Sequence, residues 1–308
     1  MPPGLRIHST RQKILMSRPV SFPLIGLLYF ATDTSMPIVE FAHAAAERAF
    51  ESILLPEHSH IPVSSDTPFP AGGELPDRYR RLLDPYISLG IIATQTNLKI
   101  GTCISLVAQH DPITLAKTIA TLDFISQGRF SLGVGYGWNR AELVDHGHQF
   151  NERREVVREY VELMRTLWRD TEAEFRGDHV SLSRSWAWPK PVQQPSVPVL
   201  LGCAPTKRGY ADIVRWADGW IPSGDDANLL ANRLEILRSQ WHEAGRSESG
   251  PIIWAMQSVV DDNALRTNLD RFHALGITQV VLDLQTVSRD DLLPILDRYA
   301  QVRVTTFS

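Results

Sequence analysis

Strand-like and helix-like segments alternate along almost the whole chain, and this alternation restricts the possible folds more than any other feature. Each apolar run typical of a buried strand is followed by a pattern in which apolar residues recur on one helical face. We count eight such strands, at residues 22–30, 52–56, 98–106, around 130–134, 197–202, 219–221, 252–260 and 279–284. Eight strand–helix units predict a closed (β/α)8 TIM barrel, an α/β fold with a parallel sheet. An open doubly wound sheet is the alternative, but the number of units and the length of 308 residues favour the barrel.

One connection, between the fourth and fifth strands, is much longer than the others. It holds a strong helical pattern around Val156 and Tyr160, and then an aromatic, proline-rich stretch at 186–191. Long barrel loops are usually functional, so we expect an insertion after strand 4. We expect a single barrel domain at residues 21–308. Residues 1–20 are basic, lack the apolar core of a secretory signal, and predict a loose tail with Met16 as an alternative start.

Composition narrows the classes of partner. The net charge of -4 gives no reason to expect nucleic acid or an anionic membrane as a partner. The longest apolar run, residues 23–31, is far shorter than the roughly 20 residues that a membrane span needs. Two cysteines are too few for a disulfide framework and fit a reducing, cytoplasmic location.

The active site of a barrel enzyme lies at the carboxyl ends of its strands, where Glu57 and His58 follow the second strand. A carboxylate beside an imidazole can position a proton donor or acceptor, because histidine titrates near neutrality. A polar surface loop is the alternative for this pair. His58 and His60 also have the spacing of metal ligands, although Asp283 is the only matching residue at another strand end.

Glycines mark the ends of the fourth and fifth strands. Gly133, Gly135 and Gly137 lack Cβ atoms, which would let the backbone approach a flat or charged group. The backbone N–H groups of 202–204, just before a helix, could hold a phosphate. Tight turns between strand and helix are the alternative at both places.

The cysteines and tryptophans have less specific patterns. No activating base is adjacent to Cys103 or Cys203, so we expect small buried side chains rather than nucleophiles. Trp138, Trp186 and Trp188 could line an apolar substrate pocket, or could pack the insertion on the barrel.

Three stretches, 54–60, 128–140 and 185–191, make the sequence similar to the luciferase-like monooxygenase superfamily. The resemblance is closer to its branch of oxidoreductases that use the deazaflavin coenzyme F420, and it extends from about residue 22 to the C-terminus. Such proteins hold a tricyclic ring against a bulge after strand 3 that often contains a non-proline cis peptide. Here that position matches Cys103 and Ile104.

The resemblance also implies residue roles. Glu57 stands where many relatives have an aspartate beside the ring, and His58 matches a proton donor of the F420-dependent sugar-phosphate dehydrogenases. Trp138 replaces the catalytic glutamate of those dehydrogenases, so sugar-phosphate oxidation is not expected. The implied cofactor contacts are Glu57, Cys103, Ile104, Gly135, Tyr136, Gly137, Trp138 and Asn139 around the ring, and Gly202, Cys203 and Ala204 at the tail phosphate.

These observations favour hydride transfer between F420 and an unidentified small organic substrate by a homodimeric enzyme, with His58 and Glu57 as catalytic residues. An FMN-dependent monooxygenase of the same fold, using reduced flavin and oxygen, is the principal alternative. A non-catalytic deazaflavin-binding protein and a metal-dependent barrel hydrolase using His58 and His60 are further alternatives.

Overall fold

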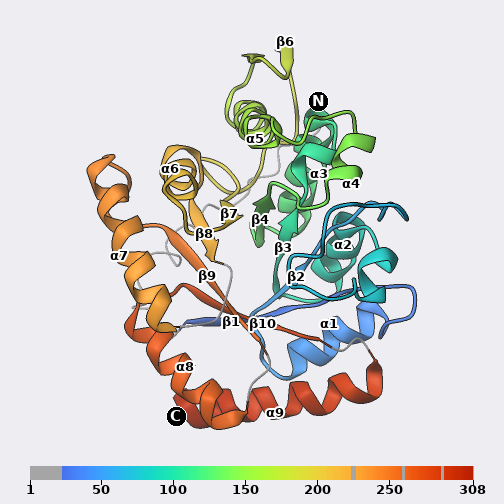
Figure 1. Ribbon diagram of the computed structural model, residues 1–308, viewed down its shortest axis with the longest axis vertical. Helices are drawn as coiled ribbons and strands as arrows, with labels where there is room; N and C mark the ends of the chain where they lie inside the picture. The colour runs from blue at the N-terminus through green and yellow to red at the C-terminus, as the bar shows by residue number, and fades with distance from the viewer. Residues whose placement is uncertain (1–22, 223–226, 259–260, 286–287, 308) are drawn as a thin grey trace, which may run out of the picture.

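Eight parallel strands close into a barrel in the computed structural model, which describes residues 23–222, 227–258, 261–285 and 288–307. Around the barrel the order is β1, β2, β3, β4, β7, β8, β9 and β10, and β10 pairs with β1 to close the sheet (Figure 1). The strand bounds are β1 Leu24–Leu28, β2 Ser52–Leu55, β3 Lys99–Ser105, β4 Phe130–Gly135, β7 Val199–Cys203, β8 Gly219–Pro222, β9 Ile252–Gln257 and β10 Gln279–Asp283. The predicted (β/α)8 barrel is therefore confirmed.

Helices cover the outside of this sheet (Figure 1). They are α1 Ile38–Glu47, α2 Pro85–Gln95, α3 Pro112–Ile125, α6 Lys207–Trp216, α7 Ala227–Glu243, α8 Asp262–Ala274 and α9 Arg289–Phe307. Alternate residues of each strand point to opposite faces, so apolar side chains form two layers. The larger layer lies between strands and helices, and a smaller group that includes Leu54, Leu200 and Trp254 packs separately from it.

Local sequence signals account for the helix boundaries. Asp111 caps α3 by accepting a hydrogen bond of 2.7 Å from the N–H of Thr114, with Pro112 at the first helical position. Residues 77–95 form a 3-10 helix, η1 Asp77–Arg81, followed by α2, rather than one continuous helix. Asp84 caps α2 and Pro85 lacks the N–H that a continuous helix would need, which explains the break.

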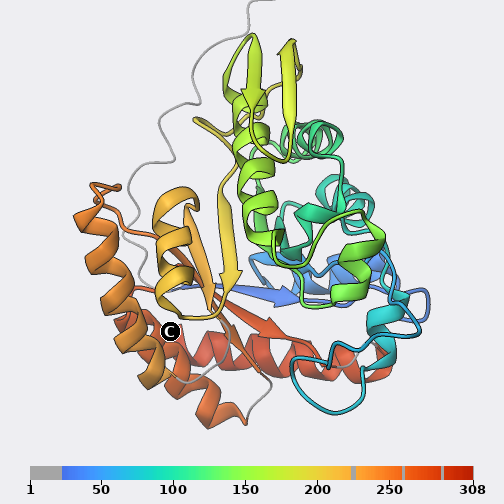
Figure 2. The same cartoon turned by 45° about the horizontal axis from the view of Figure 1, so that its top comes forward.

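The predicted insertion after β4 is present and contains more structure than its sequence indicated. It includes α4 Arg140–Asp145, α5 Arg153–Arg169, and an antiparallel hairpin of β5 Ala173–Arg176 and β6 Ser181–Ser185. Figure 2 shows this hairpin extending from the body of the molecule beyond α5. The hairpin strands are short and mostly polar, so they lack the apolar run that revealed the barrel strands.

The predicted tail at residues 1–20 lies outside the described residues, and its separation from a domain at 21–308 remains a prediction. Within the part of the chain that is described, no helix has both the length and the apolar character required to cross a membrane.

Candidate functional site

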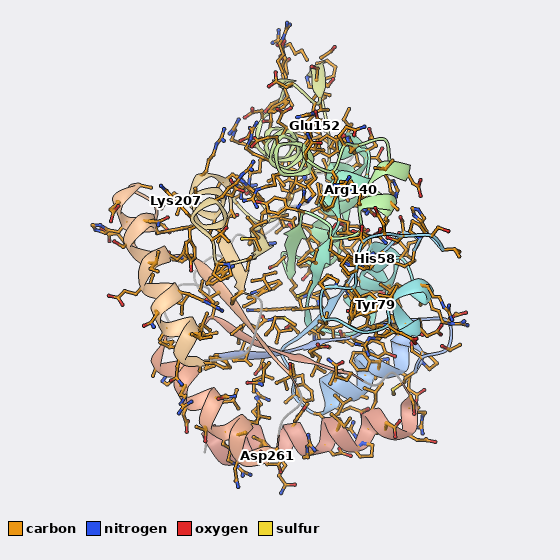
Figure 3. All side chains as sticks on the ribbon, viewed as in Figure 1. His58, Tyr79, Arg140, Glu152, Lys207 and Asp261 are labelled. Atoms are coloured by element: carbon orange, nitrogen blue, oxygen red, sulfur yellow. The ribbon has the colours of Figure 1, made fainter. Side chains whose placement is uncertain are left out.

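The candidate site lies where the barrel strands end, beneath the long connection between β2 and α2. Figure 3 shows His58 and Tyr79 next to each other in this region, with Arg140 above them and Lys207 farther away on α6. Because parallel strands all end on the same side of the barrel, side chains from distant parts of the sequence meet here.

A bulge interrupts β3 at the position that the resemblance indicated. The peptide bond between Cys103 and Ile104 is cis. The register with β4 shifts between Thr102 and Ser105, so that Ser105 aligns with Val134. The expected bulge and cis peptide are both present.

The side chain of Ile104 explains two of the glycines at the strand ends. A Cβ on Gly135 would lie 2.2 Å from Cδ1 of Ile104, and a Cβ on Gly202 would lie 2.9 Å from its Cγ2. These distances are shorter than normal carbon–carbon contacts of about 3.5–4.0 Å. The two glycines therefore form a socket for Ile104, a requirement of the protein's own packing.

Glu57 forms hydrogen bonds with the residues that follow the cis peptide of the bulge. Its carboxylate accepts hydrogen bonds of 2.7 Å from the hydroxyl of Ser105 and the N–H of Leu106, and it lies 2.7 Å from Nε2 of His110. Since Ser105 donates to Glu57, the hydroxyl of Tyr86, 2.7 Å away, donates to Ser105. The Glu57 carboxylate is only 7% exposed and has several donors, so its observed contacts serve the bulge.

Charge pairing perturbs both members of the Glu57–His110 pair. Burial raises the pKa of Glu57, but the hydrogen bond and charge of His110, with the bonds from Ser105 and Leu106, leave that pKa below its ordinary value. Burial lowers the pKa of His110, but the hydrogen bond and charge of Glu57 leave it above its ordinary value. Both shifts have the sign expected when each side chain stabilises the charged form of the other.

His58 belongs to a second, separate network. Its Nδ1 lies 2.8 Å and 3.0 Å from the two carboxylate oxygens of Glu142, and its Nε2 accepts a hydrogen bond of 3.3 Å from the indole N–H of Trp138. The His58 side chain is 6% exposed and that of Glu142 is 1% exposed. The structure thus brings the predicted residues His58 and Trp138 together.

Aromatic side chains surround this histidine. The ring of Tyr79 lies 5.7 Å from that of His58, and the ring of Phe69 packs edge-on against both Tyr79 and Trp138. Trp138 and Asn139 also line a cavity of about 390 Å³ under the β2–α2 connection, together with Ile61, Pro62, Val63, Ser65, Thr67, Phe69, Gly73, Leu75, Pro76 and Arg80. This cavity has the size of a small-molecule site, and its walls combine apolar side chains with polar ones.

The thiols have no nucleophilic character. Burial and the charge of Asp283 raise the pKa of Cys103 to about 12, and its sulfur lies 3.7 Å from that of Met256. Burial likewise raises the pKa of Cys203 to about 12. A thiol with such a pKa is protonated at neutral pH, in agreement with the sequence-based expectation for both residues.

Asp283 ends β10 with one carboxylate oxygen poorly satisfied. Its Oδ2 accepts a hydrogen bond of 2.6 Å from Gln285, whereas its buried Oδ1 has no hydrogen-bond partner among the residues that the structure describes. Burial raises the pKa of Asp283, and the charge of Arg78 and the bond from Gln285 only partly offset this effect.

Basic residues gather where β4 and β7 end. Tyr136 donates a hydrogen bond of 2.6 Å to Asp212, which also pairs with Arg154. Gly202, Cys203 and Ala204 lead into α6, whose first turn carries the exposed residues Lys207 and Arg208. Burial lowers the pKa of Arg153. The nearby charges of Arg154, Arg208 and Arg140 lower it further.

The other two predicted pocket tryptophans lie elsewhere. Trp186 and Trp188 follow β6 and are 74% and 59% exposed. Trp186 lines a separate outer cavity of about 400 Å³ between α3, α5 and the hairpin, and the carbonyl of Trp188 accepts a bond from Lys117 on α3. Trp186 and Trp188 therefore lie in the insertion, away from Trp138. This arrangement corresponds to the alternative in which they pack the insertion on the barrel, not to a pocket shared with Trp138.

The imidazoles after β2 point to different carboxylates. His60 lies 3.0 Å from Asp145, whereas His58 contacts Glu142. Among the residues that the structure describes, no group of three or more His, Cys, Asp or Glu side chains could hold a metal ion. The metal-hydrolase alternative therefore has no support in the described part of the chain.

The sequence did not identify Glu142 as a site residue. It also did not indicate that Ser105 and His110 bond to Glu57, or that Tyr86 bonds to Ser105. Glu142 follows Asn139 by three residues, which is the spacing of an ordinary helix cap. Its contact with His58 spans 84 residues of sequence, so no local pattern marks it.

Comparison with known proteins agrees with this architecture. The family model of luciferase-like monooxygenases matches residues 29–274, and the chain belongs to this family of oxidoreductases. It is 42% identical over 279 residues to the uncharacterized protein Rv0953c of Mycobacterium tuberculosis, a match covering 89% of this chain and 96% of the relative.

Solved structures show the same fold at low identity. Monooxygenase RslO1 from Streptomyces bottropensis has a TM-score of 0.74 at 17% identity, over 92% of this chain and 99% of that one. An F420-dependent secondary alcohol dehydrogenase in complex with an F420-acetone adduct has a TM-score of 0.72 at 19% identity, over 93% of this chain and 100% of that one. Because a shared fold does not determine chemistry, these two neighbours support the architecture alone.

Proposed function

We propose that this protein is an F420-dependent oxidoreductase that transfers a hydride between the deazaflavin and a small organic substrate. The observation that carries the proposal is His58, which is fixed between Glu142 and Trp138 in an aromatic pocket. A fixed imidazole suits proton transfer that accompanies hydride transfer. An F420-dependent secondary alcohol dehydrogenase has the same fold, so this fold is compatible with the deazaflavin.

The basic residues at the ends of β4 and β7 fit the tail of such a cofactor. Arg153 donates a hydrogen bond of 2.5 Å to the carbonyl of Phe150 and stacks on its ring, while its buried Nε has no partner among the described residues. Within the same residues no carboxylate pairs with Arg153, Arg140 or Lys207. F420 carries a phosphodiester followed by glutamate carboxylates, whereas FMN ends in one phosphate. Several unpaired cations therefore favour the longer anionic tail.

Each part of the site then has a role. The bulge at Cys103 and Ile104 and the segment from Gly135 to Asn139 would hold the ring, and the backbone of 202–204 would hold the tail phosphate. The bound deazaflavin supplies the hydride at its central carbon. His58 exchanges the accompanying proton, the aromatic side chains exclude water, and Glu57 holds the bulge in place.

Titration with F420 and, separately, with FMN tests the choice of cofactor. We expect fluorescence quenching with F420 at lower concentration than with FMN. Arg153→Ala should weaken F420 binding more than FMN binding, whereas Arg169→Ala should change neither, because Arg169 is exposed and paired with Asp170. Tight binding of FMN without binding of F420 would reject the proposal.

An FMN-dependent monooxygenase is the second candidate. The family description favours it, and the fold, which monooxygenase RslO1 shares, is compatible with it. Oxygen consumption with reduced FMN and a substrate would identify this activity. Turnover of F420 without oxygen uptake would exclude it, and cofactor binding without turnover of any acceptor would indicate a binding protein.

We also propose that the enzyme is a cytoplasmic homodimer. Apolar side chains are exposed on α2, α3 and the segment after β6, such as Ile87, Phe124 and Trp186, and they support a surface that a second copy of the chain covers. Sedimentation equilibrium should give twice the chain mass of 34.6 kDa, and a single-chain mass at micromolar concentration would contradict the dimer.

A further inference from the structure

Glu142 occupies a position where sequence predicts only a helix cap. Asn139 caps α4 by accepting hydrogen bonds of 3.1 Å and 3.4 Å from the N–H groups of Ala141 and Glu142. A glutamate at this position usually turns back to the N–H of the capping residue. Here the carboxylate instead reaches the imidazole of His58 on the far side of the site.

This contact determines which nitrogen of His58 carries a proton. Glu142 is 1% exposed, and an ionised carboxylate buried so deeply needs a hydrogen-bond donor. The carboxylate can only accept, so Nδ1 of His58 carries the hydrogen. The indole N–H of Trp138 can only donate, so Nε2 of His58 presents a lone pair to it at 3.3 Å. Both contacts select the same neutral tautomer.

We propose that Glu142 is a positioning residue that fixes the Nδ1–H tautomer and the ring orientation of His58. Nε2, whose one hydrogen bond among the described residues is the long one from Trp138, is then the nitrogen that exchanges a proton with the substrate. A carboxylate that orients an imidazole in this way is a recurrent arrangement in acid–base catalysis. The exchange role of His58 rests on the proposed function, whereas its tautomer is a property of the protein without cofactor.

Nuclear magnetic resonance of protein labelled with 15N-histidine tests the tautomer directly. Two-bond couplings to the ring protons show which nitrogen is protonated, and the missing signal in His58→Ala assigns the resonance. We expect protonated Nδ1 and unprotonated Nε2 for His58 in the wild-type protein. Protonated Nε2 with bare Nδ1 would overturn the proposal, whether or not F420 or FMN binds.

Two substitutions separate orientation from charge. Glu142→Gln keeps an oxygen that accepts from Nδ1–H and should retain the tautomer, whereas Glu142→Leu removes the acceptor and should shift His58 toward Nε2–H. Asp145→Asn is the matched control, because it lies on the same helix but contacts His60. A Glu142→Leu spectrum identical to wild type would overturn the proposal. If that variant does not fold, the tautomer of His58 measured in the wild-type protein still tests the proposal.

Kinetics provide a second readout. Glu142→Gln should lower kcat by about 10-fold or more because the countercharge is lost, while the KM for the cofactor stays within about twofold. Asp145→Asn should change neither value. Glu142→Leu should lower kcat at least as much, because it also removes the acceptor for Nδ1–H, and an unchanged kcat in this variant would remove the positioning role. Absence of turnover in the wild type would instead reject the proposed function and leave the spectroscopic test intact.

Discussion

The socket for Ile104 makes a quantitative prediction about Gly135. Gly135→Ala places a Cβ at 2.2 Å from Cδ1 and 3.1 Å from Cγ1 of Ile104. Overpacking of this kind costs about 1–3 kcal/mol. Replacing glycine also stabilises by about 0.4–1 kcal/mol through the unfolded chain. We therefore expect Gly135→Ala to lower the free energy of unfolding by about 1–2 kcal/mol.

A double-mutant cycle assigns this loss to the predicted contact. Ile104→Val removes Cδ1, the atom nearest to the new Cβ, and alone costs about 0.5–1.5 kcal/mol. The double variant should recover at least about 1 kcal/mol relative to the sum of the single effects. Urea denaturation of the protein without cofactor measures each corner of the cycle.

Gly90→Ala is the matched control. No atom lies within 4 Å of the position that its Cβ would occupy, and Gly90 lies inside α2, so this change should stabilise by about 0.5–1 kcal/mol. Additive effects of Gly135→Ala and Ile104→Val, or stabilisation by Gly135→Ala equal to that by Gly90→Ala, would refute the socket.

His58→Ala should lower kcat by about 10²–10⁴-fold with little change in cofactor affinity by fluorescence titration, and unchanged turnover would exclude a proton role. Glu57→Gln should destabilise the protein by about 3 kcal/mol near pH 6. The stability that ionised Glu57 contributes is present above its ordinary pKa of 4.5 and is lost as the pH falls through its lowered pKa. The stability that charged His110 contributes is present below its ordinary pKa of 6.5 and is lost as the pH rises through its raised pKa. Urea denaturation at pH 3, 6 and 9 should therefore show the largest difference from wild type at pH 6, and an equal difference at all three would contradict the ion pair. Asp283→Asn should raise the free energy of unfolding at pH 7, because burial disfavours the charged carboxylate and so raises the pKa of Asp283. The difference between variant and wild type should shrink as acid protonates the wild-type carboxyl. A lower denaturation midpoint of the variant at pH 7 would contradict this.

The barrel could be predicted from sequence because its signal is local and repeated. Each buried strand needs a short apolar run, and each covering helix needs one apolar face, so the pattern occurs eight times along the chain. The cap of α3 at Asp111 was predictable for the same reason, since donor and acceptor lie three residues apart. The polar hairpin of β5 and β6 was not predictable, because neither strand carries that periodicity.

At the candidate site, the sequence by itself determined which residues stand at the strand ends, including His58, Glu57 and Gly135. Only the tertiary structure decided what they contact. It directed Glu142 to His58 across 84 residues and filled the space beside Gly135 with Ile104. Such contacts depend on barrel closure and side-chain direction, which periodicity does not encode, so residue types mark the place of the site while packing assigns the partners.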